Sequence, residues 1–253
     1  MPSWNIHLEA GERIAKKLRF DKTKKQEFLF ACILPDINNG YINSPKITKP
    51  HHETHYAHDQ KSSLNFYAEN KSQIDAKNPI YLGYLFHLYT DGFFNYDFYR
   101  TIKRHPLGEN KTHEEKARIK HHDFWLYDTN FHHELNIGRE NAEAIAGKAS
   151  KINVIQITAD DILEIDAILK RKDLNDHIKN DNYIFYSKEA LDNLMEDMIE
   201  SFTNDYLRSN HAWATRSWDH PSRAFKVHHQ KDAKKHRHFM WKIFHRCSSG
   251  RNR

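Results

Sequence analysis

One long segment, residues 80–100, is among the most apolar in the chain and constrains the fold more than any other part. Pro79 precedes it, and proline is common in the first turn of an α-helix because that turn leaves backbone N–H groups unpaired in any case. Gly83, His87 and Asp91 recur at intervals of four, so they share one face of the predicted helix. The stretch therefore predicts a long, largely buried helix that carries a histidine and a carboxylate on one side.

The rest of the chain also favours helices. Among its 253 residues are eight glycines, and valine occurs only at positions 154 and 227, whereas large sheets usually draw on valine and on glycine-bearing turns. Further helices are expected over residues 4–20, near 114–128 and 141–150, and after the predicted N-caps Thr158 and Ser187. We therefore expect an all-α fold, with one helical metal-binding domain at residues 1–210 and a basic C-terminal extension at residues 211–253.

Two polar stretches are expected to connect helices. Residues 21–25 are predicted to form a linker, and residues 38–62 a long loop of the kind that often carries function.

An apolar run over residues 28–34 predicts a helix that ends before Pro35, because the residue before a proline disfavours helical geometry.

The composition excludes several classes of protein. No stretch approaches the roughly 20 apolar residues of a membrane-spanning helix. The charged residues among the first twenty are incompatible with the apolar core of a signal peptide. Two cysteines, Cys32 and Cys247, are too few for a disulfide framework or a cysteine-based metal site. We therefore expect a cytoplasmic protein in a reducing compartment.

Histidine, the commonest metal ligand, is unusually abundant, with 20 residues. On the predicted helix, His87 and Asp91 can reach one ion, and their nitrogen and oxygen atoms suit zinc. The alternative is a hydrogen-bonded His–Asp pair without a metal, although burying such an aspartate without a partner is unfavourable.

Three further places offer ligands. His7 is predicted to face inward from its helix, and the segment 51–59 concentrates histidines and acids. Asp36 follows Pro35 at the expected C-terminal end of a helix, where the helix dipole disfavours an acid. Each also has an ordinary interpretation: a core histidine, a solvated loop and a helix-terminal turn.

In this order the features resemble the bacterial zinc-dependent phospholipase C family, whose all-helical superfamily includes the fungal single-strand nucleases. The resemblance is carried by Trp4…His7, Pro35-Asp36, Thr54-His55-Tyr56…Asp59 and Tyr81-Leu82-Gly83…His87-x-x-x-Asp91. The opening Met1-Pro2-Ser3-Trp4 and the segment Lys120–Asp128 are similar to an uncharacterised cytosolic branch of that family. The resemblance covers residues 1–208 and implies a cluster of zinc ions that activates water to attack a phosphodiester.

The resemblance also implies a role for each residue. His7 would bind one metal, Asp36, His55 and His87 a second, and Asp91 would bridge the two. Asp36 and Asp91 are the expected catalytic residues, with Asp36 or a neighbouring acid orienting the attacking water. Further candidate ligands are Asp59, His121, His122 and Asp123.

Two ions are expected rather than three. Asp97 and Trp125 stand where the family has a further histidine and a glutamate. Zinc is the expected cofactor, and another divalent metal is the alternative.

The end of the chain is strongly basic. Residues 223–253 contain ten lysines and arginines but one acid, Asp232, and aromatic residues such as Phe239 and Trp241 lie among them. Such a segment can bind nucleic acid through phosphate contacts and base stacking. It can equally bind an anionic membrane surface, or it can be a solvated terminus.

These features give two main hypotheses. The first is a metal-dependent phosphodiester hydrolase that acts on a phospholipid head group, a nucleic acid or a nucleotide. The alternative is a non-catalytic helical module with a structural metal or none, whose basic tail binds nucleic acid or an anionic membrane. A third possibility is an unrelated helical metallophosphohydrolase built around the adjacent His122 and Asp123.

Overall fold

The structure, a computed structural model, describes residues 2–37, 49–57, 62–171 and 182–208. It divides the chain into two compact units, Met1–Asn204 and Asp205–Arg253. The described residues form helices and connecting loops, with no strand among them, and this confirms the expected all-α class. The predicted basic segment 223–253 lies outside the described residues, together with its candidate nucleic-acid and membrane contacts.

The helices are, in chain order, α1 (Trp4–Lys17), α2 (Lys22–Ala31), α3 (Leu34–Ile37), α4 (His51–Thr54), α5 (Ser62–Asn70), α6 (Pro79–Ile102), α7 (His113–Asp128), α8 (Arg139–Ala149), α9 (Ala159–Leu169) and α10 (Lys188–Phe202). Short 3₁₀ turns, η1 (Lys71–Gln73) and η2 (Pro106–Gly108), lie on either side of α6 in the chain, and the π-helix η4 (Thr203–Arg208) follows α10. None of these helices is both long enough and apolar enough to cross a membrane.

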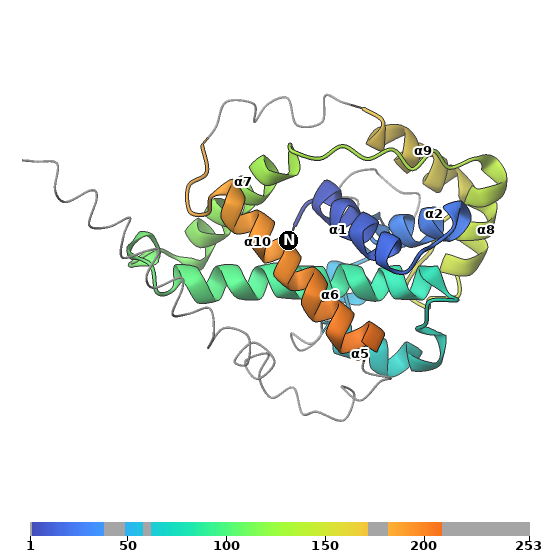
Figure 1. Cartoon of the computed structure of the whole chain (residues 1–253), viewed down its shortest axis with the longest axis horizontal. Helices are drawn as coiled ribbons and strands as arrows, with labels where there is room; N and C mark the ends of the chain where they lie inside the picture. Colours follow the sequence, from blue (N-terminus) through green and yellow to red (C-terminus); the bar gives the residue numbers. More distant parts are fainter. Residues whose placement is uncertain (1, 38–48, 58–61, 172–181, 209–253) are drawn as a thin grey trace, which may run out of the picture. The chain divides into compact units, whose positions relative to one another are not determined.

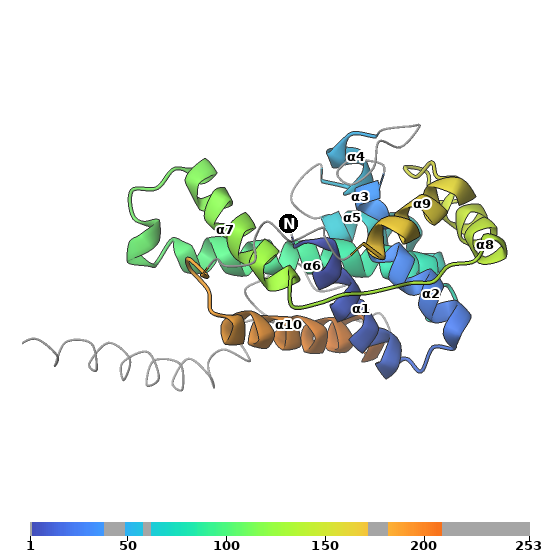
Figure 2. The same cartoon turned by 90° about the horizontal axis from the view of Figure 1, so that it is seen from above.

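Helix α6 is the central element of the first unit (Figure 1). It packs against α1, α2, α3, α5, α7, α8 and α10, and every residue from Pro79 to Asp91 is buried. Helix α10 lies on one side of α6, and α3 and α4 lie on the other (Figure 2). The predicted long, buried helix is therefore confirmed, and it forms the core around which the other helices pack.

The contact between α2 and α6 depends on Gly83. A Cβ atom at this position would lie 2.5 Å from the carbonyl oxygen of Phe28 and 2.7 Å from the Cβ of Ala31. Since both distances are below van der Waals contact, a side chain at position 83 would force the two helices apart. The glycine thus lets α2 and α6 approach closely one turn before His87.

Three local predictions are wrong. The pattern over residues 21–25 predicts a linker, but α2 begins at Lys22 because Asp21 Oδ1 accepts the backbone N–H of Lys24 and caps the helix. The predicted loop 38–62 contains the helical turn α4 and the start of α5; residues 38–48 and 58–61, including the candidate ligand Asp59, lie outside the described residues. Asp36 does not follow a helix C-terminus, because α2 ends at Ala31 and Asp36 lies in the first turn of α3.

Both predicted N-caps are confirmed. The Thr158 hydroxyl accepts the N–H of Asp161 at 3.2 Å, and the Asp161 carboxylate accepts the N–H of Thr158 at 2.7 Å, which makes a capping box. Ser187 Oγ accepts the N–H of Ala190 at 3.1 Å. These short-range bonds satisfy backbone donors that the helix itself leaves unpaired, which is why the sequence alone indicates them.

Candidate metal centre

Five predicted ligands converge in the core of the first unit. His7 comes from α1, Asp36 from α3, His55 from the residue directly after α4, and His87 and Asp91 from α6. All five are buried, and the side chains of His7 and His87 are fully inaccessible to solvent. The inward orientation of His7 that the helical spacing predicts is therefore confirmed.

Four ligand atoms form a compact set: Asp36 Oδ1, His55 Nε2, His87 Nε2 and Asp91 Oδ2. The Nε2 atom of His55 lies 3.3 Å from Asp36 Oδ1, 3.2 Å from His87 Nε2 and 3.6 Å from Asp91 Oδ2. The Nε2 atom of His87 lies 3.5 Å from Asp91 Oδ2 and 4.0 Å from Asp36 Oδ1. Ligands bonded at about 2.0–2.1 Å to a tetrahedral zinc ion lie about 3.3–3.4 Å from one another. His55, His87 and Asp91 therefore fit three corners of one tetrahedral ion, and Asp36 Oδ1, beside His55, is a candidate for the fourth.

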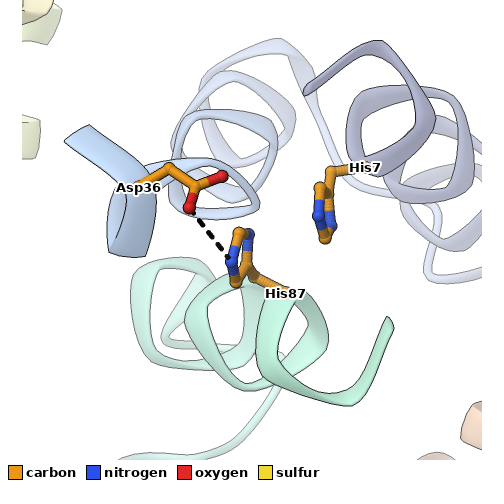
Figure 3. A group of neighbouring side chains, drawn as sticks. All are labelled: His7, Asp36 and His87. Atoms are coloured by element: carbon orange, nitrogen blue, oxygen red, sulfur yellow. Dashed lines mark ion pairs between the residues drawn. The ribbon is translucent and has the colours of Figure 1, made fainter. Parts of the chain in front are cut away.

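His7 joins this set through the other oxygen of Asp91. Its Nε2 atom lies 3.3 Å from Asp91 Oδ1, and its ring stacks on the His87 ring with centroids 4.1 Å apart. Figure 3 shows these two rings side by side and the Asp36 carboxylate directed at His87. Within the described part of the chain, Nδ1 of His7 has no hydrogen-bond partner, and Nε2 and Asp91 Oδ1 face each other without hydrogen-bond geometry. Buried polar atoms are nearly always paired, so His7 and Asp91 Oδ1 form a candidate second half-site.

The geometry also defines two groups of three possible ligands, His7 with Asp36 and His87, and His55 with His87 and Asp91. In each group the ligand atoms all lie within 4.8 Å of one another. Because both groups contain His87, they belong to one cluster rather than to two separate sites.

Groups outside the cluster orient the histidine rings. The Nδ1 atom of His87 lies 2.8 Å from the carbonyl oxygen of Cys32, so its N–H donates there and Nε2 keeps its lone pair facing the other ligands. The Nδ1 atom of His55 lies 3.0 Å from the Thr54 hydroxyl, which itself donates to the carbonyl oxygen of His51 at 3.4 Å. This chain of hydrogen bonds leaves the Nε2 atom of His55 free to bind a metal.

Helix α1 supplies a further contact through Trp4. The indole N–H of Trp4 donates to Asp36 Oδ2 at 3.2 Å, and Oδ1 of the same carboxylate faces His55. The first turn of α1 is held in turn by Asp128 at the end of α7, which accepts the Asn5 amide at 2.9 Å and the Ile6 backbone N–H at 3.2 Å. A carboxylate at a helix N-terminus is stabilised by the helix dipole, so Asp128 fixes the turn that carries Trp4 and His7.

Burial and the charges of the cluster shift the pKa of His7, Asp36, His87 and Asp91. Burial, reinforced by the charge of His87, lowers the pKa of His7 and favours the neutral, metal-binding imidazole. Burial alone would raise the pKa of Asp36 and of Asp91, but the charges and hydrogen bonds of the neighbouring histidines, His87 first among them, together outweigh it and both values are lowered. Burial lowers the pKa of His87, whereas Asp91 and Asp36 raise it, and their effect prevails. The carboxylates are therefore held ionised, which is the form that binds a cation.

Other candidate ligands are not brought into the cluster. The carboxylate of Asp123 accepts three backbone N–H groups of residues 184–186 at 2.7–2.9 Å and so anchors the segment before α10. The Nε2 atom of His122 lies 3.1 Å from the carbonyl oxygen of Asn182, and the His121 side chain is exposed. Asp97, where the family has a histidine, accepts the Tyr186 hydroxyl at 3.0 Å.

Two of the supporting residues are not found by sequence reasoning. The Trp4 bond to Asp36 and the Asp128 cap on α1 join residues far apart in the chain, and no local pattern indicates them. The one available signal is the placement of both residues in segments that resemble the phospholipase C family.

Comparison with known proteins does not assign the chain to a family. No family model, no curated protein and no solved structure matches this chain. The likeness to the zinc-dependent phospholipase C family thus rests on the residues named above, and membership of that family stays a prediction.

Proposed function

We propose that the chain is a metal-dependent phosphodiester hydrolase, with zinc or another divalent ion bound by His7, Asp36, His55, His87 and Asp91. The observation that carries the proposal is the convergence of these five buried side chains on one another. Burying two ionised carboxylates among imidazoles is unfavourable without a compensating charge. A divalent cation supplies that charge, and the same ligand types are those that zinc prefers.

Each ligand has a place in this proposal. Asp36, His55, His87 and Asp91 Oδ2 would hold one ion, and His7 and Asp91 Oδ1 the other. A pair of divalent ions supplies Lewis-acid activation of water and stabilises charge on the entering and leaving oxygens of a phosphodiester. The half-site of His7 and Asp91 has fewer protein ligands, so it is the side at which a water molecule and a phosphate oxygen would enter.

The carboxylates have distinct tasks in the reaction. Asp91 places one oxygen in each half-site and so sets their separation. Asp36 would accept a hydrogen bond from the attacking water, and the Trp4 N–H keeps its carboxylate in a fixed orientation.

One observation favours a second candidate function, a non-catalytic helical module with a structural ion. Structural zinc sites are closed by four protein ligands, whereas catalytic sites keep an open position. The set of Asp36, His55, His87 and Asp91 has four such ligands. If only this set binds an ion, the metal stabilises the fold and no hydrolysis is expected.

Metal content and hydrolysis measured together distinguish the two functions. Untagged protein, never exposed to a chelating resin, is analysed by elemental mass spectrometry and assayed with bis(p-nitrophenyl) phosphate. We expect two zinc ions per chain and turnover in the wild type, and loss of both in Asp91→Asn and His87→Ala. The control His122→Ala, which changes a histidine outside the cluster, should keep both. One tightly bound ion without turnover would favour the structural module, and full turnover by Asp91→Asn would contradict the proposed mechanism.

A further inference from the structure

Lys120 is a buried cation close to the metal centre. This residue of α7 is only 6% exposed, and its ammonium group donates to Asn95 Oδ1 at 2.7 Å. The ammonium also lies 5.0 Å from the centre of the Tyr99 ring. No carboxylate among the described residues forms an ion pair with it. A buried ammonium without a carboxylate is costly, so the position favours an anion that the described chain does not provide.

The Lys120–Asn95 pair lies at the Asp91 end of the cluster. Asn95 follows Asp91 by four residues on α6, which places it on the same helix face and about 6 Å further along the axis. Burial lowers the pKa of the Lys120 ammonium group, and the negative charge of Asp91 offsets part of this effect. Asn95 itself is only half-buried, so this side of the pair is within reach of a ligand.

The donors of the pair suit a phosphate group. An ammonium has three N–H donors, of which Asn95 accepts one, and the Asn95 amide has two donors of its own. Hydrogen bonds between such donors and an ionised oxygen are the strong ones. A quaternary ammonium group in the same place would be repelled by Lys120.

We propose that Lys120 and Asn95 form an anion-binding subsite that selects phosphodiesters carrying a second phosphate on the neighbouring unit, as in an oligonucleotide, over zwitterionic head groups such as phosphocholine. The proposal rests on the proposed hydrolase function and names its substrate class. Asp91 and Asn95 lie one helical turn apart. The second phosphate must therefore be close to the scissile phosphate.

Matched substrates test the selectivity with the zinc-loaded full chain. The dinucleotide TpT and its 5′-phosphorylated form pTpT differ by one phosphate, and p-nitrophenyl phosphocholine provides the cationic head group. We expect kcat/KM for pTpT to exceed that for TpT by about tenfold or more, and phosphocholine to be the poorest substrate.

Two variants remove the subsite in different ways. Lys120→Met deletes the charge, and Asn95→Asp keeps the lysine but gives it a carboxylate partner with almost no change in volume. Each should bring the pTpT to TpT ratio close to one. Lys116→Met, one turn earlier on α7, removes the same charge further from Asp91 and should keep the wild-type ratio. An unchanged ratio in both subsite variants, or a wild-type preference for phosphocholine, would overturn the proposal.

A binding measurement separates failure of the subsite from failure of the hydrolase function. Calorimetric titration with thymidine 3′,5′-bisphosphate and with thymidine 5′-monophosphate needs no turnover. Tighter binding of the bisphosphate that is lost in Asn95→Asp supports the subsite even if no diester is hydrolysed. Equal affinities for the two ligands in the wild type would reject it, whatever the activity.

Discussion

Asp91 is the residue on which the cluster depends most, because its two oxygens face different histidines. Oδ1 lies 3.3 Å from His7, and Oδ2 lies within 3.6 Å of both His55 and His87. The spacing of residues along α1 and α6 is enough to predict that His7, His87 and Asp91 face inward, because a helical period is a local property. Their distances from Asp36 and His55 depend on how separate helices pack, and no local pattern determines that packing.

The Trp4 side chain should matter for metal binding although it is not a ligand. Trp4→Phe keeps an aromatic ring but removes the N–H that donates to Asp36 Oδ2 at 3.2 Å. Loss of such a supporting hydrogen bond typically weakens metal affinity by about 10–100-fold. Competition with a chromophoric zinc chelator measures this change, and circular dichroism shows whether the fold is kept. Wild-type affinity in a folded Trp4→Phe protein would show that the bond does not orient Asp36.

The stability of the metal-free protein should depend on pH through His7. Burial holds the pKa of His7 below its usual value of about 6.5. Below that pH the unfolded chain therefore binds a proton that the folded chain does not, and stability falls by up to about 1.4 kcal/mol per pH unit. Urea unfolding of the chelated protein across this range measures the slope. His7→Gln should have a shallower slope, and an identical slope would show that His7 is protonated in the folded state.

At the scale of helices, the elements with a clear apolar stripe or a side-chain cap are the ones that the sequence predicts. Helices α6 and α10 belong to this group, and both are found close to their expected positions. The first turn of α2 and the whole of α4 are missed, because they consist of polar residues with no apolar period. The turn α4 nevertheless positions His55, so part of the candidate site depends on an element that periodicity does not indicate.

Two glycines of α6 should respond oppositely to the same substitution. Gly83→Ala would place a Cβ atom 2.5 Å from the Phe28 carbonyl oxygen, and such overpacking typically costs about 1–3 kcal/mol. Gly92 is exposed, and a Cβ atom added there would meet no atom of the described residues within 4 Å, so Gly92→Ala should stabilise the helix by about 0.5–1 kcal/mol. Thermal unfolding of both variants measures the two effects. If Gly83→Ala left the stability unchanged, α2 and α6 would be able to move apart without destabilising the protein.

At the scale of the whole molecule, the strongly basic segment and the candidate metal ligands lie in different parts of the chain. The five clustered ligands lie within residues 7–91, whereas residues 223–253 carry ten basic residues and one acid. The first compact unit, Met1–Asn204, contains the entire cluster. Hydrolysis and polyanion binding are therefore expected to be separable by truncation.

Deletion of residues 223–253 tests this separation. The shortened chain should retain its metal content and its hydrolysis of bis(p-nitrophenyl) phosphate, because no clustered ligand is removed. Its affinity for single-stranded DNA or for anionic vesicles should fall, and so should the salt dependence of that binding, since fewer counterions are released. Loss of hydrolysis of the small diester would show that the tail contributes to the reaction itself.

The positions of the ligands along the chain have a mechanical consequence. The two ions proposed for His7, Asp36, His55, His87 and Asp91 would tie four distant points of the polypeptide to one place and close the stretches between them into loops. Such a cross-link restricts the unfolded chain as a disulfide does, while Cys32 itself is a free, buried thiol. A pulling force applied at the two ends of residues 7–91 would therefore act first on the coordination bonds. The loops would extend only after the metal is released.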